Sequence, residues 1–185
     1  RFYETTPDFL LEGSTSFDGS NDYIAIGDDS TLDFGATDDF SISLWMKMDT
    51  ANADIDGLIM KYTGGVGYQI RKDADEKISW TIRDDTTQPL VSSSVLNIGE
   101  WYHIVGVRDA QVALNLYVNG VQVATASDGT SASNTLANTD DVWIGRNAFT
   151  DTNYFDGLIN EVAIWDAALD ADAVTELYGS GTPLL

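Results

Sequence analysis

Apolar and polar residues alternate over short segments of the chain, and turn residues break this alternation at close intervals. In FSISLWMKM, residues 40–48, every second side chain is apolar, and KISWTIRD, residues 77–84, repeats the pattern. A period of two places alternate side chains on opposite faces of a β-strand. Both segments are therefore predicted to be antiparallel strands with one buried face.

The same pattern predicts further strands along the chain, joined by turns rich in Gly, Asp, Asn and Ser. They are residues 14–17, 23–26, 57–62, 67–72, 90–95, 101–108, 114–118, 142–146 and 157–165. Asn119-Gly120 predicts a type I′ hairpin, because both residues tolerate positive φ. Residues 127–141 are predicted to be a surface loop.

One helix is predicted near the end of the chain, over residues 170–179. Asp170 is a helix-capping residue type, and Gly179 and Pro183 stop a helix. The helix has an apolar stripe of Val174, Leu177 and Tyr178. Together these elements predict one all-β domain over residues 1–185, with residues 1–13 as an N-terminal extension. Its expected architecture is a two-sheet antiparallel β-sandwich, a jelly roll, carrying one short C-terminal helix.

Charge and composition exclude several function classes. Thirty acidic residues against nine basic ones give a net charge of -21, which disfavours nucleic acid and anionic membranes as partners. No apolar stretch approaches the ~18 residues of a membrane span, so membrane insertion is not expected. With no cysteine, disulfide scaffolds and thiol chemistry are excluded. Because the chain starts at Arg1, we expect it to be part of a longer parent protein with other domains.

Six segments in order resemble the laminin-G-like, concanavalin-A-like jelly-roll family in its bacterial or phage form. They are SFDGSNDYIAI, FSISLWMK, GEWYHIVGVRD, LNLYVNGVQVA, VWIGRN and FDGLINEVAIWDAALDADAVTELYGSG. The resemblance covers residues from about Ser14 to Gly181. It implies the sandwich fold, but this fold carries lectins, glycanases, adhesion modules and structural domains, so function must be sought in the site.

His103, the one histidine, is predicted to be scaffold. It shares a strand phase with Trp101, Val105 and Val107, which points it into or beside the core, hydrogen-bonded to backbone. The similar strand of the family also reads Trp-x-His. No Gly-x-Ser-x-Gly elbow exists for a Ser-His-Asp mechanism. Trp45 lies on the polar face of its strand, so it is either a sugar platform or covered by a loop or the terminal helix, and the family resemblance favours cover.

Carboxylates show no glycosidase pattern. Hydrolysis of a glycosidic bond needs two carboxyl groups at a set separation, and relatives commonly carry Glu-x-Asp-x-x-Glu on one strand. The six glutamates are scattered singly here. The Asp84-Asp85 and Asp140-Asp141 pairs are interpreted as solvated turns. The chain is therefore predicted not to be an enzyme.

Calcium is the predicted cofactor. Ca²⁺ binds six to eight oxygens, which separate loops can supply together. Two candidate loops are FDGSND and FDGLINE. In the resembling family the terminal strand often carries Asp where this chain has Asn160. A second interpretation, that Asp18-Gly19 and Asp156-Gly157 only form turns, stays open. The candidate metal ligands are Asp18, Asp22, Asp156, Asn160 and Glu161.

The richest candidate ligand site is the loop GRNAFTDTNYFDG, because sugar rings pack on aromatic side chains beside polar groups. Phe149 and Tyr154 would serve as platforms, or would only pin the loop to the core. Three residues from other strand ends would join the site if those ends converge: Tyr68, Arg83 and Asp84. The loop itself contributes Arg146, Asn147, Phe149, Asp151, Asn153 and Tyr154.

The sequence is consistent with two functions. The first is a non-catalytic binding or adhesion module of an extracellular or cell-surface protein, recognising glycan or another cell-surface ligand with help from calcium. The second is a structural or decorating domain of a virion surface or large adhesin, with no small-molecule ligand. The second predicts an ordinary loop face and self-association through an exposed edge or patch.

Overall fold

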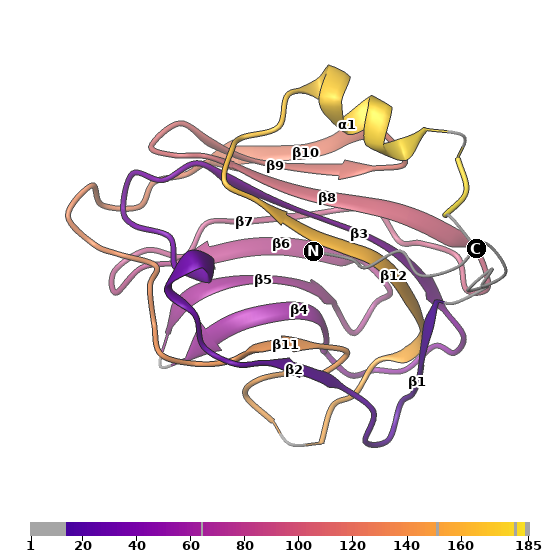
Figure 1. The fold of residues 1–185 in the computed structure, drawn as a ribbon. Helices are drawn as coiled ribbons and strands as arrows, with labels where there is room; N and C mark the ends of the chain where they lie inside the picture. The colour runs from indigo at the N-terminus through magenta and orange to yellow at the C-terminus, as the bar shows by residue number, and fades with distance from the viewer. Residues whose placement is uncertain (1–13, 64, 151, 180, 184–185) are drawn as a thin grey trace, which may run out of the picture.

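Twelve strands among the described residues form two antiparallel sheets that lie face to face (Figure 1). The computed structural model describes residues 14–63, 65–150, 152–179 and 181–183, so the predicted extension 1–13 lies outside the described residues. Sheet A has the order β1 (Thr15–Asp18), β12 (Asp156–Trp165), β3 (Phe40–Met48), β8 (Trp101–Asp109), β9 (Ala113–Val118) and β10 (Val121–Ser127). Sheet B has the order β2 (Ile24–Ile26), β11 (Val142–Ile144), β4 (Asp56–Thr63), β5 (Val66–Lys72), β6 (Ile78–Arg83) and β7 (Leu90–Ser92). The predicted β-sandwich is confirmed.

Two predicted strands are shorter in the structure, each for a local reason. β7 ends at Ser92, because the Ser93 hydroxyl oxygen accepts the hydrogen bond from the Ile78 N–H at 2.9 Å. β11 ends at Ile144, because Gly145 adopts a φ of 81°, which leaves the β region. The Asn119-Gly120 turn is confirmed, with φ of 52° and 77°. A 3₁₀ turn over Ser30–Leu32 precedes β3.

The main core lies between the two sheets. The apolar phase of β3 faces it, as the alternation predicts, and Ile42, Leu44 and Met46 have no exposed surface. Trp80 of β6 and Ile104 of β8 are equally buried. The inward faces of both sheets therefore form one continuous apolar layer, which supplies most of the driving force for folding.

A second, smaller core lies on the outer face of sheet A, beneath α1 (Ala171–Tyr178) (Figure 1). Asp170 caps the helix by accepting a hydrogen bond from the Ala173 N–H at 2.8 Å, as predicted. Val174 of the helix packs among side chains of β8 and β9, which are Val105, Val107 and Tyr117. The C-terminal segment thus closes one side of the sandwich.

This cover corrects the prediction that β3 is half-buried. Its polar phase is buried too: Trp45 is 2 % exposed and its ring stacks on Tyr178 at 5.6 Å, which confirms that Trp45 is covered. The Ser41 hydroxyl donates to the Ala167 carbonyl at 2.7 Å and accepts from the Leu169 N–H at 3.0 Å. Hydroxyl groups on this face therefore anchor the segment that leads into α1.

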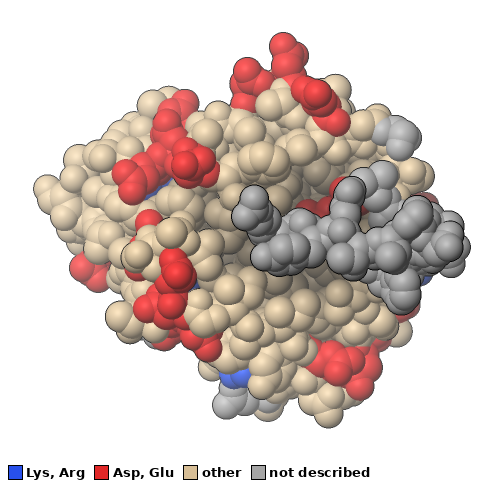
Figure 2. All heavy atoms as spheres, in the orientation of Figure 1, with Lys and Arg blue, Asp and Glu red and all other residues tan. Residues whose placement is uncertain are grey.

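Three basic side chains are buried completely and hold loops onto the sheets. Lys61 contacts Asp28 at 2.7 Å and Asp33 at 3.2 Å, and Lys72 contacts Asp56 at 3.2 Å. Arg108 is the third. Figure 2 accordingly shows acidic side chains in several patches, one of them over α1, but few basic atoms on that face. Among the described residues no helix is long and apolar enough to cross a membrane.

Candidate ligand-binding site

Aromatic side chains and an arginine gather on the outer face of sheet B, where β2 and β11 lie side by side. Trp143 points to this face, because its two neighbours in β11 are buried in the core. Tyr23, directly before β2, meets Trp143 at 5.3 Å between ring centroids. The Cζ atom of Arg146 lies 4.4 Å from the Trp143 centroid and 5.1 Å from that of Tyr23. Tyr154 stacks on Tyr23 at 6.3 Å, and these four residues are called the aromatic–arginine cluster.

The loop between β11 and β12 positions Arg146 and Tyr154, which pair across it as an isolated β-bridge. Inside the loop the Asn147 N–H donates to the Asn153 carbonyl at 2.9 Å. The Asn147 side chain is buried and donates to the Ile55 carbonyl at 2.8 Å. The loop is therefore tied both to itself and to the start of β4, which holds the cluster in a fixed geometry.

The predicted loop residues divide into two groups. Arg146 and Tyr154 belong to the cluster, and Phe149 is 55 % exposed with its ring 4.8 Å from Tyr62. Asn147 and Asn153 instead hold the loop in place, since both side chains donate to the Ile55 carbonyl. Asp151 lies outside the described residues. The loop therefore offers three exposed or half-buried groups for contact with a ligand.

Sequence reasoning missed Tyr23 and Trp143. A signal for Trp143 was present, because it lies out of phase with Val142 and Ile144, the two apolar neighbours that mark the core face of the strand. Tyr23 is likewise out of phase with Ile24 and Ile26. No local pattern indicates that these two aromatic residues meet, because β2 and β11 are 116 residues apart and pair only in the folded sheet.

Three other predicted ligand residues do not join the cluster, which corrects the expected convergence. Tyr68 lies in the main core, where its hydroxyl donates to the Leu32 carbonyl at 3.1 Å and burial raises the pKa of the phenol. Arg83 ends β6 beside Gly65, across β5 from Tyr62. Asp84 is fully buried and acts within a different loop.

Asp84 is a structural acid, not the solvated turn residue that its Asp-Asp pair suggested. Burial alone would raise its pKa, but its carboxylate accepts hydrogen bonds from the N–H groups of Ser131, Thr86 and Thr87 at 2.8, 2.8 and 2.6 Å. These bonds favour the charged form and lower the pKa of Asp84 to about 2. Asp84 therefore fastens the 127–141 loop to the end of β6.

This environment predicts an acid-dependent loss of stability. The folded pKa of Asp84 lies below the ordinary value of 3.8, so its contribution to stability is present above about pH 4 and is lost as the pH falls through about 2. The contribution of Asp84 to the free energy of unfolding is about 2 kcal/mol, because each unit of pKa difference between the folded and unfolded protein corresponds to about 1.36 kcal/mol. We expect Asp84→Asn to lower the free energy of unfolding in urea at pH 7, and the difference from the unsubstituted protein to shrink below pH 4. Asp85→Asn, at the exposed neighbour, is the control. An equal difference at pH 7 and pH 2.5 would contradict this role.

The five predicted calcium ligands fall into two groups, one at the Asp18–Asp156 pair and one further along β12. Asp18 and Asp156 are cross-strand partners, and Asp22 accepts a hydrogen bond from the Asp18 N–H at 3.2 Å. The second interpretation, that Asp18 forms a turn, agrees with its hydrogen bonds. Its carboxylate accepts from the N–H groups of Ser20 and Asn21 at 2.8 and 3.2 Å. These bonds lower the pKa of Asp18.

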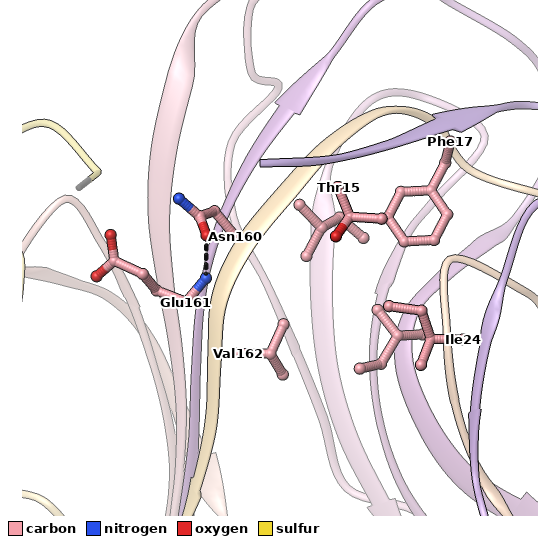
Figure 3. Close-up of a pocket in the computed structure, with 8 residues that line it drawn as sticks. Thr15, Phe17, Ile24, Asn160, Glu161 and Val162 are labelled. Atoms are coloured by element: carbon pink, nitrogen blue, oxygen red, sulfur yellow. Dashed lines mark hydrogen bonds between the residues drawn. The ribbon is translucent and has the colours of Figure 1, made fainter. Parts of the chain in front are cut away.

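Asn160 and Glu161 lie further along β12, at a bulge. The Asn160 side chain accepts from the Glu161 N–H at 2.9 Å, and Glu161 points away from Phe17 and Ile24 (Figure 3). In the part of the chain that the structure describes, no three His, Cys, Asp or Glu side chains are placed to hold a metal ion. The predicted set does not fit one site. Calcium binding stays a prediction, for which a calcium-selective rise in melting temperature over EDTA is the test.

Two hollows flank this bulge. One, of about 320 Å³, opens between the edges of the two sheets and is lined mainly by apolar side chains, among them Phe17, Ile24 and Val162 (Figure 3). The other, of about 280 Å³, lies on the outer face of sheet A beside Trp165 and Leu177. Neither adjoins the aromatic–arginine cluster in its lining residues.

His103 lies beneath α1, beside the core as expected, but the expected hydrogen bond from its Nδ1 to the backbone is not present among the described residues. Its ring is 3 % exposed, between Trp45 at 5.1 Å and Tyr178 at 6.1 Å. Burial lowers the pKa of His103 to about 4, and among the described residues no group hydrogen-bonds its Nδ1. A neutral imidazole packed between aromatic rings is scaffold, as the sequence predicts.

Two six-stranded antiparallel sheets with a helix packed on one of them define the class of lectin-like jelly-roll domains. The chain belongs to the concanavalin A-like lectin/glucanases superfamily, because the Laminin_G_3 family model matches residues 18–175. No curated protein sequence matches the chain.

Solved structures with the same fold include three toxin domains. The binding domain of Paraclostridial Mosquitocidal Protein 1 superposes with a TM-score of 0.69 at 17 % identity, covering 92 % of this chain and 47 % of that one. The botulinum neurotoxin serotype G binding domain superposes with a TM-score of 0.68 at 18 % identity, covering 90 % of this chain and 46 % of that one. The botulinum neurotoxin serotype D binding domain superposes with a TM-score of 0.72 at 15 % identity, covering 90 % of this chain and 42 % of that one. The chain thus spans less than half of each, and at this identity the likeness shows the fold.

Proposed function

We propose that this domain is a non-catalytic binding module that recognises a glycan through the aromatic–arginine cluster. The observation that carries the proposal is the Arg146 guanidinium held against Trp143 and Tyr23, of which Tyr23 is 45 % exposed. Aromatic rings pack against the C–H faces of sugars, and a guanidinium offers several fixed donors for their hydroxyl oxygens. Such a combination on a rigid sheet suits a sugar ligand.

The similar structures support a binding role. All three are described as binding domains of larger toxins. By analogy we propose that this chain is a recognition domain of a larger secreted or surface protein, with a glycan or another cell-surface ligand as partner. An extracellular or cell-surface location goes with this proposal, and a virion surface is the alternative location.

A non-enzymatic role is supported by the distribution of reactive groups. The chain lacks the Glu-x-Asp-x-x-Glu pattern of glycanases with this fold, and its one histidine is packed beneath α1. The acidic side chains with the firmest hydrogen-bond partners, such as Asp84 and Asp128, hold loops in place.

The test is a glycan-array screen followed by calorimetric titration of the best ligand with two tryptophan variants. We expect Trp143→Ala to weaken binding at least about tenfold, since a central aromatic contact is worth about 2 kcal/mol. Trp165→Ala is the matched control, because Trp165 is also partly exposed but lies on sheet A. It should bind as the unsubstituted domain does.

The outcomes of this experiment distinguish a binding module from a structural or decorating domain. Equal loss of binding in both tryptophan variants, or none in either, would remove the cluster from the proposal. Absence of any glycan ligand on the array would favour the structural or decorating domain. Melting curves of each variant show whether lost binding reflects lost folding.

A further inference from the structure

Lys72, the last residue of β5, buries its ammonium group among oxygen atoms of one short segment. The Nζ atom donates to the Asn52 carbonyl at 3.1 Å, to the side-chain oxygen of the same residue and to the Asp54 carbonyl at 3.0 Å. It also pairs with the Asp56 carboxylate at 3.2 Å. All four oxygens belong to residues 52–56, which lead into β4, so one ammonium group holds the whole segment.

Charge and burial make this attachment strong. The side chains of Lys72 and Asp56 are each 1 % exposed, so loss of the ammonium would leave a buried carboxylate without its cation. Carbonyl, amide and carboxylate oxygens are also the atoms with which proteins bind hard cations. Lys61, further along β4, is surrounded in the same way by two carboxylates and two backbone carbonyls. Each lysine is therefore a cation that the chain itself supplies to a set of loop oxygens.

Ile55, inside the segment held by Lys72, connects it to the ligand site. The Ile55 carbonyl accepts hydrogen bonds from the side chains of Asn147 at 2.8 Å and Asn153 at 3.4 Å. These two residues close the loop between β11 and β12, because the Asn147 N–H donates to the Asn153 carbonyl at 2.9 Å. Arg146 and Tyr154 adjoin them directly and pair across the loop. The position of one carbonyl thus bears on both cluster residues of the loop.

Gly57 provides a second, direct contact between the start of β4 and the cluster. A Cβ atom on Gly57 would lie 2.1 Å from the carbonyl oxygen of Arg146, so the two backbones are packed with no side chain between them. Gly57 follows Asp56, the residue that pairs with Lys72. A displacement of residues 52–56 would therefore reach the backbone of Arg146 along this contact as well.

We propose that Lys72 is a positioning residue of the ligand site, whose ammonium fixes residues 52–56 and through them the place of Arg146 against Trp143. Lys72 is not itself a ligand contact, because its side chain is buried. For recognition this role rests on the proposed glycan function. The geometric part of the proposal is separate, because the shape of the cluster can be measured without a ligand.

The experiment is NMR spectroscopy of the whole chain, labelled with ¹⁵N and free of ligand. It reads the chemical shift of the Trp143 indole N–H, assigned with Trp143→Phe, and the hydrogen-exchange rate of the Asn147 amide. Lys72→Met keeps a long unbranched side chain and removes the ammonium. We expect the indole signal to move and exchange at Asn147 to become at least about tenfold faster, since losing one charge-assisted hydrogen bond changes a local opening equilibrium by about that factor. An unchanged indole signal overturns the proposal.

A second variant and a control separate positioning from lost stability. Lys72→Met combined with Asp56→Asn leaves no unpaired buried carboxylate, and should still move the indole signal. Arg108→Ala is the control, because it also removes a fully buried cation, but one that holds residues 35–38 and 128–130. It should leave the Trp143 signal in place.

The outcomes distinguish this proposal from the proposed function. An equal change at Trp143 in Arg108→Ala and Lys72→Met would reflect a general loss of stability and would overturn the positioning role. A change confined to the Lys72 variants supports that role, even where the glycan array finds no ligand and the proposed function fails.

Discussion

Replacing Arg108 by alanine is expected to lower the free energy of unfolding by about 3–5 kcal/mol. The guanidinium has no exposed surface and contacts Asp128 at 3.1 Å through Nε. Its other nitrogens donate to the carbonyls of Gly35 and Ala36 at 2.9 and 2.7 Å, and to the Thr130 hydroxyl at 3.0 Å. The substitution would leave Asp128 charged and buried without its partner, and would release the loop that precedes β3.

Urea denaturation at pH 7 measures this loss. Arg71→Ala is the matched control, because Arg71 pairs with Asp73 at 2.9 Å but both side chains are about one-fifth exposed. Ion pairs with access to solvent are worth about 0–1 kcal/mol. A loss below about 1.5 kcal/mol for Arg108→Ala would show that the buried pair adds little to stability.

Replacing Trp80 by alanine is expected to destabilise the fold by a similar amount, about 3–5 kcal/mol. Trp80 is fully buried between the sheets, where its ring meets Phe40 at 5.6 Å and its Nε1 donates to the Val107 carbonyl at 3.1 Å. Alanine would leave a large cavity and would remove the hydrogen bond to the Val107 carbonyl. The indole therefore joins sheet B to β8 both by packing and by a hydrogen bond.

The contact of Trp80 with Gly106 allows a sharper test by a double-mutant cycle. A Cβ on Gly106 would lie 2.6 Å from the indole Cδ2, so Gly106→Ala should cost about 1–3 kcal/mol in the unsubstituted protein. In a Trp80→Phe background the smaller ring leaves room, and the same substitution should cost less. Additive effects in the cycle would mean that the ring does not restrict residue 106.

The fold could be predicted from the sequence because the residue patterns that favour strands, turns and helices are local. The alternation over residues 40–48, the Asn119-Gly120 turn and the capping Asp170 each act within a few residues, and the structure confirms all three. The order of six family-like segments then indicated the sandwich, which the family match confirms. Burial of the polar phase of β3 was not predictable, because the cover comes from residues 165–178, far along the chain.

Only part of the candidate site could be predicted from the sequence. The 146–154 loop could be found from its composition, but the aromatic–arginine cluster also needs Tyr23, which reaches Trp143 through pairing of β2 with β11. Conversely, Asp84 and Tyr68 have suitable chemistry for a ligand site, and the structure buries both. Residue type alone does not distinguish a ligand contact from a buried anchor.

Sequence alone is enough for the class of elements, the turns between them, the acidic charge and the absence of cysteine, since these depend on neighbouring residues and on composition. The pairing of distant strands sets which aromatic residues meet, which carboxylates lie apart and which basic side chains are buried. The physical reason is that strand pairing brings together residues more than a hundred positions apart, and burial then sets the hydrogen-bond partners and charge state of each group.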